Sequence, residues 1–185
     1  MSPIASALNE SSTQLRDLLR DQATRDSLNG LHNRRYLDEA LGRELIRAGR
    51  EGYPVSAIMG DLDHFKAVND RHGHLAGDEV IRAFAMLIRH HARGGDICCR
   101  YGGEEFLLVF PGMPREKAAE RAEQLRRKTS ASPIACERSL ITVTASFGVA
   151  SFPYHGPTAD ALIGAADDAL YAAKTAGHNC AMVSA

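Results

Sequence analysis

The chain has 185 residues, 44% of them hydrophobic, and a formal net charge of -1; this size and apolar content predict one domain with a single core. The near-neutral charge argues against a nucleic-acid partner or a membrane surface bound through basic charge, and no apolar run approaches the roughly 18 residues of a membrane span. Four cysteines without zinc-type spacing predict reduced thiols and a cytoplasmic protein.

Hydrophobic periodicity predicts helices and strands that alternate along the chain. The first helix, residues 13–24, has leucines on one face and is expected to end a linker (residues 1–24) that precedes the domain (residues 25–185). Further helices are expected at residues 34–47, 65–70, 77–90, 115–128 and 158–176. Strands are expected at residues 55–59, in a hairpin at 97–110, at 141–151 and at the C-terminal end. Because hairpins occur among the alternating elements, the fold class is α+β with a mixed sheet.

The hairpin at residues 100–106 is the most informative segment of the chain. Gly102 and Gly103 lie between two apolar runs, which predicts a primed turn with positive φ at both glycines. The turn requires the glycines, but it does not require Glu104 and Glu105, whose adjacent charges repel each other. A divalent cation that carries phosphates would neutralise them; a solvated hairpin tip is the alternative that this segment leaves open.

A second group of carboxylates follows the apolar run at residues 55–59. Asp61 and Asp63 are expected at the end of this strand, with Leu62 between them on the opposite face, and Lys66 follows shortly after. Magnesium prefers one or two carboxylates together with phosphate oxygens and water. The two segments together predict a magnesium–phosphate site.

Several blocks in the same order resemble the GGDEF family, the diguanylate cyclases, in its GGEEF variant. The resemblance extends over roughly residues 25–183, and Asn29 stands where threonine is usual. The matching blocks are residues 26–35, 61–78, 93–96, 100–106, 143–150 and 166–179. The resemblance implies a ferredoxin-like palm of the nucleotide cyclase and polymerase kind, with a central, mixed, antiparallel-rich sheet flanked by helices.

The resemblance also implies a reaction. Two GTP molecules condense to cyclic di-GMP and two pyrophosphates, and the 3′-hydroxyl of each GTP attacks the α-phosphorus of the other. Each domain holds one GTP, so the implied partner is a second copy of the domain in a homodimer. Mg²⁺ or Mn²⁺ is the implied cofactor, and in this family a linker helix usually connects a sensor domain to the cyclase.

Three carboxylates match the family's catalytic positions. Asp61 and Glu104 match the metal-ligating carboxylates, and the carbonyl of Leu62 matches a third metal ligand. Glu105 is expected either to support a second metal or to help deprotonate the attacking hydroxyl, and both roles stay open.

Phosphate contacts are implied at two places. A short helix that begins near Phe65 would offer free backbone N–H groups to the terminal phosphates, and Lys66 and Lys174 match the family's phosphate lysines. His178 stands where arginine is usual, so phosphate contact there is expected to be weaker or pH-dependent.

Asn69 and Asp78 match the family's guanine-reading pair. A carboxylate can accept from guanine N1–H and N2–H₂, and an amide can donate to a ring acceptor. Judged by residue type alone, Asn69 is equally typical of a turn and Asp78 of a helix N-cap.

Arg93 and Asp96 match the family's product-inhibition site, where arginine holds cyclic di-GMP. Taken alone, an RxxD tetrad is common and predicts a surface ion pair. The family often adds arginines from the next helix. This sequence has Glu120 and Gln124 at such positions, and Arg121 is a candidate substitute together with Arg127.

Two other functions compete with an active cyclase. One is a catalytically silent module that senses cyclic di-GMP through Arg93 and Asp96, and the other is a cyclase or polymerase palm of related fold. Degenerate hairpins mark silent members of the family, whereas this hairpin is intact. The guanine pair and the RxxD tetrad argue against the related palm. The sequence therefore predicts an active diguanylate cyclase domain.

Overall fold

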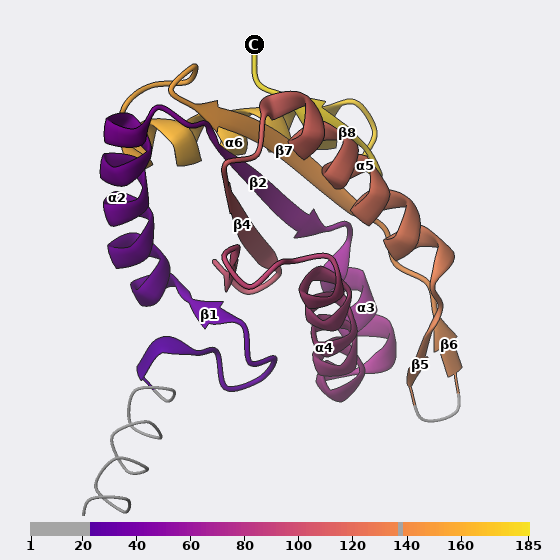
Figure 1. The fold of residues 1–185 in the computed structure, drawn as a ribbon. Helices are drawn as coiled ribbons and strands as arrows, with labels where there is room; N and C mark the ends of the chain where they lie inside the picture. The colour runs from indigo at the N-terminus through magenta and orange to yellow at the C-terminus, as the bar shows by residue number, and fades with distance from the viewer. Residues whose placement is uncertain (1–22, 137–138) are drawn as a thin grey trace, which may run out of the picture.

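The computed structural model describes residues 23–136 and 139–185, so the helix expected at residues 13–24 lies, up to residue 22, outside the described residues. A sheet with helices on both faces forms the body of the protein (Figure 1). The helices are α2 (Arg34–Glu51), α3 (Phe65–His72), α4 (His74–His90), α5 (Arg115–Ala131) and α6 (Ala159–Thr175). The strands are β1 (His32–Asn33), β2 (Val55–Leu62), β3 (Ile97–Arg100), β4 (Glu105–Pro111), β5 (Ile134–Cys136), β6 (Ser139–Ile141), β7 (Ala145–Phe152) and β8 (Ala181–Val183).

The six-stranded sheet has the order β1-β3-β4-β2-β7-β8. Its inner pairs, β3–β4, β4–β2 and β2–β7, are antiparallel, whereas the outer pairs, β1–β3 and β7–β8, are parallel. Strands β5 and β6 form a separate ribbon that projects beyond α5 (Figure 1). The mixed, antiparallel-rich sheet flanked by helices, which the sequence predicts, is confirmed.

Strand β2 separates two hydrophobic clusters because successive side chains of a strand point to opposite faces. Ile58 packs with α3, α4 and α5 on one face, whereas Ala57 and Met59 pack with α2 and α6 on the other. Every residue of β2 and of β7 is buried. Strand β2, which carries Asp61, and its neighbour β7 are therefore central strands that are covered on both faces. Within the described ranges, none of the helices combines the length and the apolar character needed to cross a bilayer.

Helix boundaries differ from the sequence predictions at several places, and two of these differences have a clear local cause. Helix α2 continues past its predicted end to Glu51 and stops at Gly52, whose φ of 76° is left-handed. Helix α4 begins at His74 and not at Gly77, because the N–H of Gly77 already bonds to the carbonyl four residues earlier, at 3.2 Å. Asp78 therefore lies inside the helix, and the N-cap interpretation of Asp78 is wrong.

The hairpin turn also differs from its prediction. Residues 101–104 connect β3 to β4, so the loop is longer than the two residues of a primed turn. Neither Gly102 nor Gly103 has positive φ, because a longer connection reverses the chain without a pair of left-handed residues. A Cβ atom at Gly102 would lie 2.5 Å from Oε2 of Glu105, so a side chain at position 102 would displace the Glu105 carboxylate.

Candidate active site

The carboxylates at the end of β2 and at the hairpin lie together because β2 and β4 are antiparallel neighbours. Asp61 is the register partner of Glu105, and the N–H of Leu62 donates to the carbonyl of Glu104 at 3.3 Å. The sheet therefore gathers the three carboxylates that the sequence singled out, although the two segments are far apart in the chain.

Burial and mutual charge act on these carboxylates. Asp61 is only 4% exposed, and this burial raises the pKa of its carboxyl above the ordinary value, while Lys174 Nζ, 2.9 Å from Oδ2, opposes the shift. Burial likewise raises the pKa of Glu104, and the negative charge of Asp61 raises it further. A divalent cation would relieve both effects, because it favours the ionised forms.

The donor set fits a hard divalent cation. Asp61 and Glu104 offer carboxylate oxygens and Leu62 a backbone carbonyl, which are the ligand types that magnesium prefers. Across residues 23–136 and 139–185, no three His, Cys, Asp or Glu side chains are grouped so as to hold a metal ion. Two carboxylates completed by phosphate oxygens and water match the way in which magnesium binds with nucleotides.

Asp63, which the sequence placed beside Asp61 in the magnesium site, has a different environment. Its carboxylate is 4% exposed and accepts hydrogen bonds from Thr144 Oγ1 at 2.6 Å, from Ser146 Oγ at 2.7 Å and from the N–H of Asn179 at 2.9 Å. Both oxygens are thus committed to protein donors. Sequence reasoning missed these partners, because they lie between 81 and 116 residues further along the chain.

The predicted phosphate contacts lie around the start of α3 and the end of α6. The side chain of Phe65 packs in the core, so its backbone N–H is the group available to a ligand, and Lys66 is exposed. The side chain of His64, the N-cap residue of α3, makes no capping hydrogen bond. Lys174 is paired with Asp61, and the ring of His178 lies 4.5 Å from the ring of His64, which precedes α3.

Helices α3 and α4, which carry the two residues of the predicted guanine pair, pack against each other at Gly77. Gly77 is buried on α4 against Asn69 of α3, and a Cβ atom added at position 77 would collide with Oδ1 of Asn69. Because Gly77 has no side chain, Asn69 can lie against α4 at the position that immediately precedes Asp78. Asn69 lies within α3, so the interpretation of Asn69 as a turn residue is wrong.

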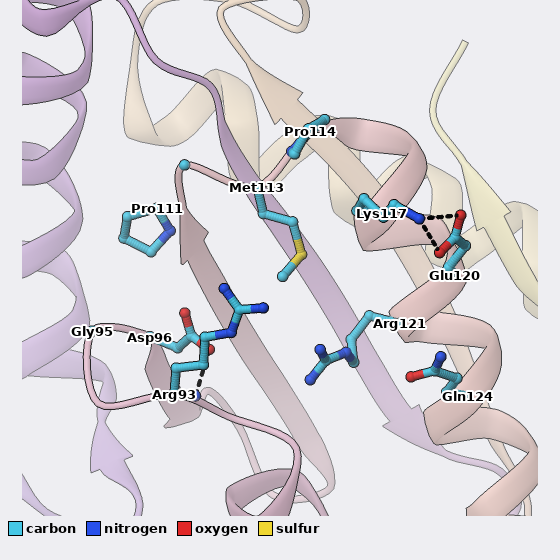
Figure 2. A pocket seen from close by; sticks show the side chains of 11 residues that line it. Arg93, Gly95, Asp96, Pro111, Met113, Pro114, Lys117, Glu120, Arg121 and Gln124 are labelled. Carbon is cyan, nitrogen blue, oxygen red and sulfur yellow. Dashed lines mark hydrogen bonds and ion pairs between the residues drawn. The ribbon is translucent and has the colours of Figure 1, made fainter.

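The tetrad at residues 93–96 borders a pocket of about 350 Å³ against α5. The Asp96 carboxylate accepts from the backbone N–H of Arg93 at 2.7 Å, so the expected ion pair with the Arg93 guanidinium is replaced by a turn contact. Figure 2 shows the side chains of Arg93 and Arg121 extending toward the same space from the tetrad and from α5. Arg121 also donates to the carbonyl of His91, whereas Arg127 pairs with a glutamate on its own helix.

A set of hydrogen bonds from Arg100, which holds the hairpin loop in place, is a feature that sequence reasoning missed. The Arg100 guanidinium donates to the carbonyl of Gly103 at 2.7 Å and to the carboxylate of Asp26 at 3.3 Å. Asp26 also accepts from the N–H groups of Leu28 and Asn29. The opening motif therefore holds the loop that carries Glu104. No local pattern could reveal this pair, since 74 residues separate its members.

Comparisons with known proteins identify the chain's relatives. The response regulator PleD of Caulobacter vibrioides is 43% identical over 159 residues, which are 85% of this chain and 35% of that protein. The diguanylate cyclase VdcA of Vibrio cholerae is 44% identical over 160 residues, or 85% of this chain and 46% of that protein. The crystal structure of the GGDEF domain of DgcB from Caulobacter crescentus, in complex with cyclic di-GMP, has a TM-score of 0.82 at 34% identity and covers 87% of this chain and 93% of that one.

The chain spans between about a third and a half of the length of these two curated relatives. A family model described as diguanylate cyclase, GGDEF domain, matches residues 23–180, which is most of the chain. This chain therefore belongs to the GGDEF domain family of diguanylate cyclases.

Proposed function

We propose that this domain is an active diguanylate cyclase that condenses two GTP molecules to cyclic di-GMP and two pyrophosphates. The observation that carries the proposal is the grouping of Asp61, Glu104 and Glu105 at the end of β2 with Lys174 of α6 beside them. The relatives support it, since VdcA is named a diguanylate cyclase and the DgcB domain was solved with cyclic di-GMP.

Mg²⁺ or Mn²⁺ bound by Asp61, Glu104 and the carbonyl of Leu62 would neutralise the developing phosphate charge. The protein's part is mostly positioning, because phosphoryl-type transfers require little covalent chemistry from side chains. Lys174 and Lys66, together with the N–H groups at the start of α3, hold the triphosphate. Glu105 either takes the proton of the attacking 3′-hydroxyl or supports a second metal.

Guanine recognition falls to Asn69 and Asp78. The Asp78 carboxylate accepts from guanine N1–H and N2–H₂, and the Asn69 amide donates to a ring acceptor. Adenine would leave the Asp78 carboxylate unpaired in the pocket, so the site selects GTP. The packing of Asn69 against Gly77 supports this assignment, because it brings α3 and α4 close enough to share one base.

A productive site requires two domains, each with one GTP, so the proposed active form is a homodimer. Product inhibition is proposed at the pocket beside Arg93, Asp96 and Arg121, where planar guanidinium groups suit phosphate or guanine edges. At the same pocket Lys117 is paired with Glu120 at 2.8 Å, so the ammonium group of Lys117 is less available to bind the ligand. Because GTP is a cytoplasmic nucleotide, the proposed location is the cytoplasm.

Incubation of the purified protein with GTP and Mg²⁺, followed by mass spectrometric identification of the product, tests the proposal. Formation of cyclic di-GMP and pyrophosphate in a ratio of one to two is the expected result. Binding of cyclic di-GMP without any turnover of GTP would instead identify a silent sensor module, and a cyclic mononucleotide would identify a different cyclase.

A further inference from the structure

Three contacts join the end of β2 and the two residues after it to the last turn of α6 and the loop that follows it. They are Asp61 Oδ2 with Lys174 Nζ at 2.9 Å, Asp63 Oδ2 with the N–H of Asn179 at 2.9 Å, and the ring of His64 with the ring of His178 at 4.5 Å between centroids. We call this set of contacts the β2–α6 seam.

Asp63 is the buried centre of the seam. A carboxylate at 4% exposure is unfavourable unless its oxygens are hydrogen-bonded, and Asp63 receives hydroxyl donors from Thr144 and Ser146 and an amide donor from Asn179. The two hydroxyls come from the start of β7 and the amide comes from the loop after α6. One side chain therefore joins β2, β7 and this loop.

The loop that Asp63 holds has an unfavourable backbone conformation. His178 and Asn179 have φ of 64° and 46°, so two consecutive residues with side chains occupy the left-handed region. Such a conformation persists only where the surroundings determine it. The Asn179 amide is bound to Asp63, and its side-chain oxygen accepts from Arg126 at 2.9 Å. Without Asp63 the loop would relax, and the direction of the His178 side chain would change with it.

We propose that Asp63 is a positioning residue for the triphosphate of GTP: it sets the conformation of residues 177–179 and thereby places His178 beside His64 at the start of α3. This inference rests on the proposed function, which assigns the terminal phosphates to that region. Asp63 does not need to touch the substrate or the metal, since its oxygens are already occupied by Thr144, Ser146 and Asn179.

Two substitutions separate a positioning role from a role that needs negative charge. Asp63→Asn keeps the hydrogen bonds, because the amide oxygen can accept from Thr144 and from the Asn179 N–H while the amide nitrogen donates to the Ser146 hydroxyl, which can also accept. Asp63→Ala removes all of them. The measurement is calorimetric affinity, in Mg²⁺, for a non-hydrolysable GTP analogue and for GMP, with thermal unfolding as the check that each variant is folded.

Asp63→Ala should weaken binding of the GTP analogue by about tenfold or more and leave GMP binding within about twofold, whereas Asp63→Asn should resemble the wild type with both ligands. The comparison between GTP analogue and GMP isolates the terminal phosphates, which a general loss of stability would not do. Equal weakening of both ligands in Asp63→Ala, or an Asn variant as impaired as the Ala variant, would overturn the inference.

A matched pair of hydroxyl deletions controls for stability and also decides the matter if Asp63→Ala does not fold. Ser146 and Ser56 are both fully buried in the same sheet, but Ser146 bonds to Asp63 whereas Ser56 bonds to the carbonyl of Met113 at the other end of β2, at 2.7 Å. Only Ser146→Ala should weaken binding of the GTP analogue relative to binding of GMP. If the wild type binds the GTP analogue and GMP equally, the assignment of the phosphate contacts is overturned as well. If Ser146→Ala keeps the wild-type preference for the GTP analogue over GMP, this inference alone is overturned.

Discussion

Glu104→Gln tests the metal assignment with the smallest change of shape. The substitution removes one negative charge from the hairpin. It leaves the backbone contact intact, because the carbonyl of Glu104, and not its side chain, accepts from the N–H of Leu62 at 3.3 Å. Any loss of activity therefore reports the missing carboxylate and not a displaced hairpin.

The expected effects on rate and on stability have opposite signs. Metal ligands that stabilise transition-state charge contribute several kcal/mol, and a loss of about 4 kcal/mol corresponds to a rate about 10³-fold lower. In the metal-free protein, burial and the charge of Asp61 raise the pKa of Glu104 above its ordinary 4.5. The folded state therefore binds this proton more tightly than the unfolded chain, and metal-free stability falls as the pH rises from 4.5 through the folded pKa. Glu104→Gln should remove the part of this pH-dependent loss of stability that the Glu104 carboxyl causes. The Tm of the metal-free variant at neutral pH should therefore equal or exceed that of the wild type.

Initial rates of cyclic di-GMP formation and thermal unfolding in EDTA measure the two effects. Glu39→Gln is the control, since Glu39 is exposed on α2 and should change neither quantity. A Glu104→Gln variant that keeps more than about a tenth of the wild-type rate, or that is clearly less stable without metal, would refute the assignment of Glu104 as a metal ligand.

Further predictions concern the base, the dimer and the product. GTP should be preferred to ATP by roughly 10⁴-fold in kcat/KM, and Asp78→Ala should impair GTP use more than Mg²⁺ binding; comparable ATP and GTP kinetics would contradict the guanine pocket. Specific activity should rise with protein concentration, and a parallel coiled coil fused before residue 13 should increase it, because a short isolated helix is marginally stable. A specific activity independent of concentration would contradict this. Cyclic di-GMP should inhibit non-competitively with GTP, and calorimetry should show weaker cyclic di-GMP binding to Arg93→Ala; equal affinity would rule out Arg93 as the anchor.

The sequence by itself determined the elements and the chemical inventory. Apolar runs and their periods predicted the central strands and most helices, because such local patterns directly encode which face is buried. The order of the motifs also identified the family. Asp61 and Glu104 were recognisable because carboxylates after a buried strand and after a glycine turn have few structural reasons to be there.

Only the tertiary structure decided which polar groups meet. The donors to Asp63 lie 81, 83 and 116 residues further along the chain, so its apparent similarity to Asp61 in sequence gave no sign of its different environment. The same holds for the pairing of Arg100 with Asp26. Hydrogen-bond partners of this kind depend on sheet register and on how closely helices approach, and these arise from packing across the whole domain and not from any local pattern.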